Sequence, residues 1–95
     1  CPKKIKDGKH VYHLYVIRSS QRDKLKKELA EKGISSAIHY PTALPFLKCY
    51  KHLNHTKDDF PIANSYTEQI LSLPMYPEVN NQEIEFICNN IIKLT

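Results

Sequence analysis

Two side chains that could do chemistry, His39 and Tyr40, stand together where a short apolar run meets a proline. Residues 35–39 predict a strand that stops here, because Pro41 cannot donate a hydrogen bond to a sheet and favours an extended backbone in the residue before it. An imidazole and a phenol at the end of a strand could bind a ligand, and His39 could also act as a general acid or base. The alternative is a turn in which the two rings satisfy only each other or the backbone. The residues alone make His39 and Tyr40 candidate binding residues and do not establish an enzyme.

A second candidate group consists of Cys49, His52 and His55, which are spaced three residues apart. Three-residue steps on a helix can converge on one metal ion, but a structural zinc site needs four ligands. His10 and His13 have the same spacing, yet they fall in a predicted strand and would point to opposite faces. We therefore expect a surface loop around Cys49 and no metal site, with a metal-binding module as an alternative reading.

Other reaction types find little support in the residues. The chain contains no Gly-x-Ser-x-Gly motif, and with only Gly8 and Gly33 it cannot form a glycine-rich phosphate loop. Its cysteines are Cys1, Cys49 and Cys88, an odd number without CxxC spacing, which argues against a disulfide framework. This cysteine pattern favours a reducing, cytoplasmic setting.

The composition indicates one small domain, because 95 residues can bury a modest core. The net charge is +4, and the lysines are concentrated in residues 1–9 and in a predicted helix after residue 20. Arg18 and Arg22 are the only arginines, so a solvated helix face is favoured over a nucleic-acid surface. A small basic α+β module that binds nucleic acid or another polyanion remains the alternative. No apolar run reaches the ~18 residues of a membrane span.

The order of elements predicts an α+β fold. We expect two layers, with a small three-stranded, mainly antiparallel sheet packed by helices. The strand at 10–18 is apolar on both faces, so it is expected to be the central one. The expected elements after the linker 1–9 are strand 10–18, a helix from Ser20 to Gly33, strand 35–39, a short helix 45–50, a polar loop 51–59, a helix from Pro61, strand 71–73, and a helix after Asn80.

Four helix ends carry recognisable capping signals, and two of them are N-termini whose candidate caps are Ser20 for the first helix and Asp59 or Phe60 for the helix from Pro61. Gly33 is predicted to adopt the left-handed conformation after the first helix, with Ile34 packing back on Leu29. Asn80 and Glu83 have the spacing of a capping box at the start of the last helix. That helix bears an apolar stripe predicted to pack on the sheet, formed by Ile84, Ile87, Cys88, Ile91 and Leu94.

Five segments, in order and in register, resemble the C-terminal small domain of the DegT/StrS-type, pyridoxal-phosphate-dependent sugar aminotransferases. They cover nearly the whole chain after residue 10. The resemblance implies fold type I of the aspartate aminotransferase superfamily, with residues 10–95 as the small domain and 1–9 as a basic linker. The matching segments are residues 11–18, 22–34, 38–41, 59–63 and 70–77.

The resemblance implies an enzyme that moves an amino group, commonly from glutamate, to a keto group on a nucleotide-linked sugar. Such reactions serve amino-sugar, lipopolysaccharide and other cell-surface polysaccharide biosynthesis. Similar enzymes are cytoplasmic homodimers with active sites at the subunit interface, and they have no nucleic-acid or membrane partner. In them, the residues that match His39 and Tyr40 lie near the partner subunit's active site and help to hold the sugar nucleotide.

The same resemblance places the pyridoxal phosphate site outside these residues. In similar enzymes the Schiff-base lysine and the other cofactor contacts belong to a large N-terminal domain. We therefore expect this chain alone to bind no cofactor and to be inactive. It also departs from relatives that read His-Tyr-Pro-x-Pro-Leu-His, because Ala43 replaces a proline and Pro45 replaces a histidine. The missing histidine leaves the identity of the sugar open.

Overall fold

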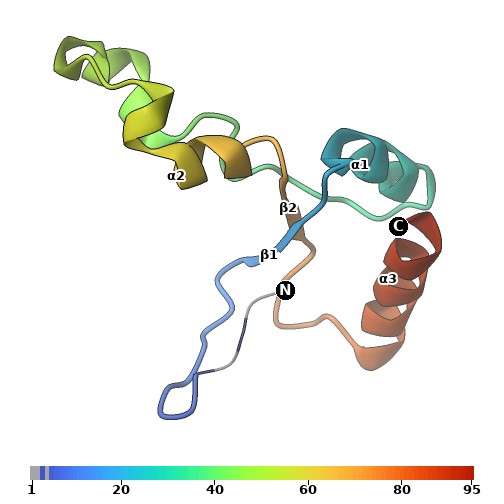
Figure 1. Cartoon of the computed structure of the whole chain (residues 1–95). Coiled ribbons are helices and arrows are strands. Elements are labelled where there is room, and N and C mark those ends of the chain that lie inside the picture. Colours follow the sequence, from blue (N-terminus) through green and yellow to red (C-terminus); the bar gives the residue numbers. More distant parts are fainter. Residues whose placement is uncertain (1–2, 4) are drawn as a thin grey trace.

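The computed structural model describes residue 3 and residues 5–95. Cys1 and Lys4, which contributed to the cysteine and charge patterns above, lie outside the described residues. The helices and strands are β1 (Tyr15–Arg18), α1 (Arg22–Glu31), α2 (Pro61–Tyr66), β2 (Ile70–Leu73) and α3 (Asn81–Leu94), and three short 3-10 helices lie at Leu44–Phe46, Lys48–Leu53 and Lys57–Asp59 (Figure 1).

A two-stranded antiparallel sheet forms the centre of the molecule. β1 pairs with β2, and Val16 lies opposite Ser72. On the other side of β2, Ala37 makes one isolated antiparallel bridge. The Ala37 amide donates to the Ser72 carbonyl at 3.1 Å, and the Ser72 amide donates to the Ala37 carbonyl at 2.7 Å. The mixed helix and strand composition is as predicted, but the third strand is reduced to this bridge.

The first predicted strand, 10–18, is shorter than expected and is not central. Only its last four residues form β1, and β2 lies between β1 and Ala37. The register pairs Tyr15 with Leu73, so the next position along β2 is Pro74. The N–H that proline lacks would lie on the Ala37 side of β2, because Ser72 two positions earlier bonds to Ala37, so Pro74 limits the third strand and not β1.

The predicted strand 35–39 is wrong except at its bridge, and Arg22 explains why. Ala37 and Ser72 exchange two hydrogen bonds, so the next such pair would join His39 to Ile70. The carbonyl of Ile70 instead accepts from Nη1 of Arg22 at 3.2 Å. A side chain from α1 thus occupies the acceptor that a longer third strand would need.

The core lies between the sheet and helices α1 and α3. Ile17 and Leu71 are paired across the two strands and belong to the buried cluster, in which both Leu29 and Leu71 are fully buried. The cluster consists of Ile17, Leu25, Leu29, Ile34, Leu71 and Ile87. Full burial of one such side chain contributes about 1.5–3 kcal/mol relative to exposure. Two helices packed with the sheet around this cluster account for the α+β fold.

The C-terminus of α1 has the predicted geometry. Gly33 has φ +76°, in the left-handed region. The Gly33 amide donates to the Ala30 carbonyl and the Ile34 amide to the Leu29 carbonyl, both at 2.9 Å. These two bonds define a Schellman motif, and Ile34 joins Leu29 in the core.

The N-terminus of α1 differs from the prediction. The cap is Gln21, not Ser20, and no side-chain hydrogen bond closes it. The hydroxyl of Ser19 accepts from the Gln21 amide at 3.1 Å instead. The serine therefore organises the turn before the helix.

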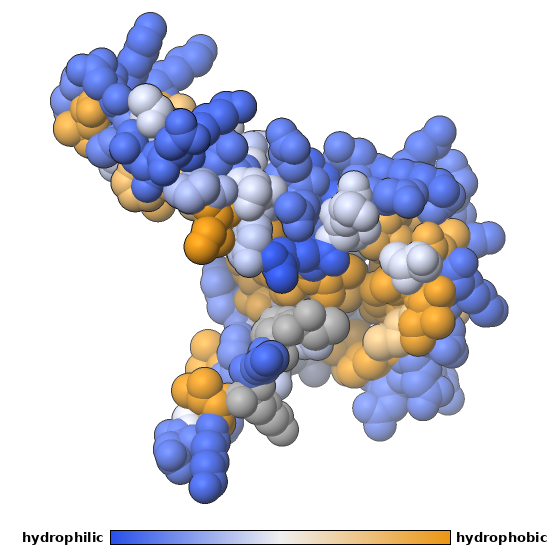
Figure 2. Space-filling view, viewed as in Figure 1, coloured by the Kyte–Doolittle hydropathy of each residue, from blue (hydrophilic) through white to orange (hydrophobic). Residues whose placement is uncertain are grey.

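Helix α3 begins at the predicted capping box but uses only part of its apolar stripe. The Glu83 amide donates to Asn80 Oδ1, and the Asn80 amide donates to Glu83 Oε2, both at 2.9 Å. Ile87 is buried, whereas Ile84 remains 44% exposed and Cys88 is exposed. The predicted packing of the full stripe on the sheet is therefore wrong. Helix α3 also packs against α1, so only part of its stripe reaches the core. An apolar groove of about 820 Å³ remains between α3 and the strands, and Figure 2 shows apolar side chains open to view beside this helix.

Residues 40–66 project from the body of the molecule as an arm (Figure 1). No residue of the fully described stretch 35–70 is buried. The 3-10 helices at Lys48–Leu53 and Lys57–Asp59 replace most of the polar loop predicted for 51–59. Helix α2 starts as predicted, with Phe60 as its cap and Pro61 at its first position.

The arm gives the molecule an extended shape. The radius of gyration over Cα atoms is 15.6 Å, whereas a compact chain of this length is expected near about 12 Å. Among the described residues, no helix combines the length and the apolar character that crossing a membrane would require.

Candidate binding site at the base of the arm

His39 and Tyr40 lie where the arm leaves the body. Nδ1 of His39 is 2.9 Å from the hydroxyl oxygen of Ser72. The rings of His39 and Tyr40 meet edge to face, with centroids 5.4 Å apart and an interplanar angle of 84°. The peptide bond between the two residues is cis. Tyr40 is 70% exposed and His39 is partly buried, so the pair presents one anchored ring and one open ring.

Ser72 is the residue that connects this pair to the sheet, and sequence reasoning missed it. It is only 4% exposed, in the middle of β2. The signal that could have found it is the single polar residue within the apolar run Ile70–Leu73. A buried hydroxyl in such a strand needs a hydrogen-bond partner, and His39 supplies one.

Two arginines anchor the chain at the C-terminal end of the arm. Arg22 is 8% exposed, and its Nη1 donates to the Thr67 carbonyl at 3.1 Å as well as to that of Ile70. Nε of Arg22 lies 2.7 Å from a carboxylate oxygen of Asp23. The guanidinium of Arg18 sits 4.1 Å from the ring centroid of Tyr66. Both ends of the arm are therefore anchored beside β2.

This arrangement can bind a ligand through the rings of His39 and Tyr40, whereas the hydroxyl of Ser72 is buried. His39 and Tyr40 offer a ring nitrogen and a phenol, both able to donate or accept hydrogen bonds. Among the residues that the structure describes, the Nε2 atom of His39 has no hydrogen-bond partner. The chemistry available here is recognition by hydrogen bonding and ring contact.

The candidate metal ligands on the arm are not brought together. Nδ1 of His52 lies 3.1 Å from the backbone carbonyl of Cys49. The ring of His55 packs edge to face against Phe60, at 5.0 Å between centroids. Within the described part of the chain, no three side chains of the metal-binding types are placed around one point. The three-residue spacing of Cys49, His52 and His55 therefore does not produce convergence.

Asp59 stabilises a turn of the arm. Its Oδ2 accepts from the Thr56 amide at 2.6 Å and from the Thr56 hydroxyl at 2.9 Å. These hydrogen bonds, that of the backbone amide first, lower the pKa of the Asp59 carboxyl below its ordinary value. Asp59, a candidate cap of the helix from Pro61, instead closes the capping box of the 3-10 helix Lys57–Asp59, and Phe60 caps α2.

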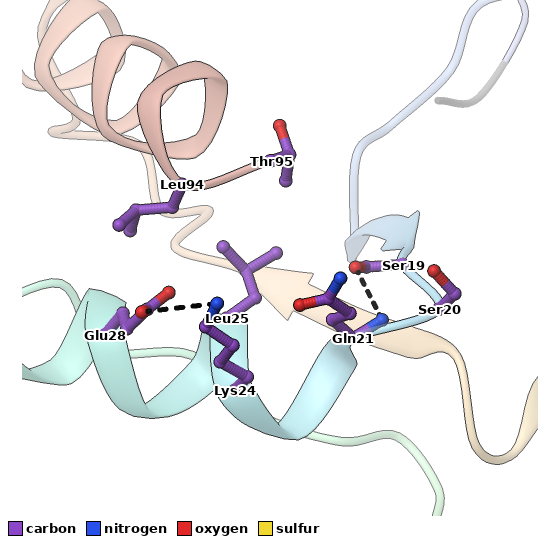
Figure 3. A pocket seen from close by; sticks show the side chains of 8 residues that line it. All are labelled: Ser19, Ser20, Gln21, Lys24, Leu25, Glu28, Leu94 and Thr95. Carbon is purple, nitrogen blue, oxygen red and sulfur yellow. Dashed lines mark hydrogen bonds and ion pairs between the residues drawn. The ribbon is translucent and has the colours of Figure 1, made fainter.

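A small polar cavity of about 110 Å³ lies at the start of α1 (Figure 3). Ser19 and Gln21 line it, together with Lys24 and Glu28, whose charged groups are 4.0 Å apart. Because the carboxylate faces the ammonium, the cavity has no net preference for an anion or a cation.

The described lysines lie at or near the surface. None of the described lysines is buried, and only Lys26 is partly covered. A cofactor lysine needs an enclosed pocket with donors for the phosphate, and Lys24, which lines the small cavity at the start of α1, is paired there with Glu28.

Comparison with known proteins identifies the family. The family model for DegT/DnrJ/EryC1/StrS aminotransferases matches residues 1–92. A UDP-N-acetyl-3-dehydro-alpha-D-glucosamine 3-aminotransferase of Acidithiobacillus ferrooxidans is 38% identical over 82 residues, which are 86% of this chain and 22% of that protein. The chain thus spans about a quarter or less of the length of the curated relatives it matches.

Solved structures give the same answer. DesV of S. venezuelae, in complex with a ketimine intermediate, superposes with a TM-score of 0.88 and 27% identity over 97% of this chain and 25% of that one. A Streptococcus pneumoniae protein described as a sugar aminotransferase, in its PLP form, gives a TM-score of 0.72 and 30% identity over 86% of this chain and 22% of that one. The fold and the sequence agree over almost every described residue, and the chain belongs to the DegT/DnrJ/EryC1/StrS aminotransferase family.

Proposed function

We propose that this chain is the C-terminal small domain of a pyridoxal-phosphate-dependent aminotransferase that acts on a keto sugar linked to a nucleotide. The observation that carries the proposal is the family match over residues 1–92. The UDP-sugar aminotransferase of A. ferrooxidans supports the substrate class, and the PLP-form relative supports the cofactor. Residues 10–95 are the small domain in this proposal, and 1–9 are the linker that enters it.

In the proposed enzyme, glutamate supplies the amino group and a large domain outside this chain supplies the cofactor site. Pyridoxal phosphate, when bound there, carries the amino group between the two substrates. The product serves amino-sugar or lipopolysaccharide biosynthesis in the cytoplasm. None of the described lysines is buried, and the proposal gives this chain no step at the cofactor.

The role of this chain is to help hold the nucleotide sugar. In a homodimer, His39 and Tyr40 would complete the partner's site from the base of the arm. The exposure of Tyr40 and the free Nε2 of His39 support this role, since both groups are available to a ligand from outside. Hydrogen bonds from neutral groups to an uncharged ligand atom are worth about 0.5–1.5 kcal/mol each, and those to a phosphate about 1.5–3 kcal/mol.

A genetic and a kinetic experiment test this proposal. The reading frame upstream of Cys1 should encode a large domain with a lysine in the cofactor motif, and a frame without one contradicts the proposal. In the longer protein, H39A and Y40F should raise KM for the keto sugar about 3- to 30-fold, as expected for one lost hydrogen bond. The half-reaction with glutamate should keep its rate. An equal loss in both half-reactions would place the two residues outside the sugar site.

A further inference from the structure

We propose that Ser72 is a positioning residue for His39, and that its buried hydroxyl donates to Nδ1 so that Nε2–H faces the ligand. The part concerning the ligand rests on the function proposed above. The part concerning the two side chains stands on the geometry of the described residues alone.

The first step is that the hydroxyl of Ser72 has little choice of partner. Ser72 is 4% exposed, and both of its backbone groups are already bonded to Ala37. Its Oγ lies 2.9 Å from Nδ1 of His39, the one side-chain hydrogen bond that Ser72 makes within the described residues. A buried hydroxyl proton without an acceptor is unfavourable, so we expect the Ser72 hydroxyl to donate its proton to Nδ1 of His39.

The second step concerns the tautomer of the imidazole. A neutral histidine has one N–H and one bare nitrogen. If Nδ1 accepts from Ser72, then Nε2 must carry the proton. The opposite arrangement, Nδ1–H donating to Ser72, would leave the hydroxyl proton buried and unpaired. The pair with Ser72 therefore selects the Nε2–H form of His39.

The third step is the consequence for recognition. Nε2 has no partner among the described residues, so a fixed Nε2–H is a donor directed away from β2. The matching ligand atom is an acceptor oxygen, as found on phosphate, carbonyl and hydroxyl groups of a nucleotide sugar. Because Ala37 bonds both backbone groups of Ser72, the sheet fixes the position of the hydroxyl, and the donor is oriented before the ligand arrives.

The direct test reads the tautomer of His39 by NMR, independently of activity. The full 95-residue chain is labelled with nitrogen-15 histidine, and two-bond nitrogen–proton spectra are recorded at alkaline pH, where imidazoles are neutral. H39Q identifies the signals among those of the five histidines. We expect a single Nε2–H tautomer in the parent chain. An Nδ1–H tautomer or an averaged spectrum overturns the proposal, and this measurement needs no variant of Ser72 to fold.

Three serine variants sharpen the result. S72A should shift the two ring nitrogens toward averaged values, and S72T should restore the parent spectrum because it keeps the hydroxyl. S36A is the matched control, since Ser36 Oγ is buried without a hydrogen-bond partner two residues before the Ile38-His39 step. Identical His39 spectra in the parent chain and S72A contradict the proposal.

Kinetic measurements separate the two hypotheses, which are that Ser72 positions His39 and that His39 binds the ligand. In the longer protein, S72A should raise KM for the keto sugar about fivefold, as loss of one positioned hydrogen bond predicts. The double variant with H39A should show no further increase. If the tautomer depends on Ser72 while H39A leaves KM unchanged, then the positioning by Ser72 stands and the ligand role of His39 fails. If H39A raises KM and S72A changes neither KM nor tautomer, then the positioning role fails and the ligand role stands.

Discussion

At the scale of single residues, Arg22 has a role that its exposed neighbours on α1 do not share. Its guanidinium is buried and donates to two carbonyls that follow the arm, those of Thr67 and of Ile70 at the start of β2. Arginine suits this position because several N–H groups in one plane can reach two acceptors at once. The side chain thus joins α1 to the start of β2.

We expect R22A to lower the free energy of unfolding by about 1–3 kcal/mol, because two partly buried carbonyls lose their donor. R22K should recover only part of the loss, since an ammonium cannot reach both oxygens with the same planar geometry. Urea denaturation of the 95-residue chain measures both changes. R18A is the control: Arg18 is exposed and contacts Tyr66 through its ring face, an interaction worth about 0.5–1 kcal/mol at an exposed site. Equal effects of R22A and R18A would contradict the role given to Arg22.

Asp59 makes one turn of the arm sensitive to acid. Its pKa is lowered in the folded arm, so its ionised form favours the turn above the ordinary value of 3.8, and this contribution is lost as the pH falls through the lowered pKa. The amide proton of Thr56 should therefore shift upfield in NMR spectra with a midpoint below 3.8. D59N should abolish this titration, while D58N should leave it in place. A midpoint at or above 3.8 would show that the hydrogen bonds from Thr56 do not persist in solution.

At the scale of elements, the helix ends were predictable because their signals are local. Gly33 and the pair Asn80 and Glu83 act within one turn of the chain, and both motifs form as predicted. Strand pairing was not predictable in the same way. The restriction of the third strand to one bridge at Ala37 depends on Arg22, which lies far from its partner Ile70 in the sequence.

Gly33 offers a direct test at this scale. G33V should lower the free energy of unfolding by about 1 kcal/mol or more, because a β-branched residue is strained at φ +76°. No atom lies within 4 Å of an added Cβ, so the cost arises from the backbone and not from a clash. G33N is the control, since asparagine tolerates the left-handed conformation, and it should cost less. Thermal denaturation of the parent chain, G33V and G33N measures the loss of stability in each variant. Equal losses in the two variants would contradict the backbone argument.

At the scale of the whole molecule, the body and the arm differ in what stabilises them. The body has one buried cluster, whereas the arm has no buried residue between 40 and 66. Apolar side chains of the arm, such as Leu44 at 69% and Ile62 at 67%, remain exposed. Large exposed apolar patches are typical of interaction surfaces, which agrees with the proposal that the chain works as part of a larger enzyme.

The absence of an enclosed lysine in the described residues leads to a prediction for the isolated chain. Mixing it with pyridoxal phosphate should give no visible absorption band that survives dialysis, because exposed lysines form only reversible adducts. Bovine serum albumin, treated in parallel, controls for nonspecific lysine labelling. A stable band that disappears when one lysine is mutated would contradict the prediction and locate a cofactor site within this chain.

The sequence by itself determined the family, the helix ends at Gly33 and Asn80 and the candidate pair His39 and Tyr40, because each depends on residue types at short, fixed spacing. Only the tertiary structure decided what holds that pair. The hydrogen bond between Ser72 and His39 spans 33 positions, and those from Arg22 to Thr67 and Ile70 span 45 and 48. Contacts at such separations form only when the core brings the elements together, and no local pattern encodes them. The fold thus anchors the ring of His39 and leaves the ring of Tyr40 open to solvent at the base of the arm.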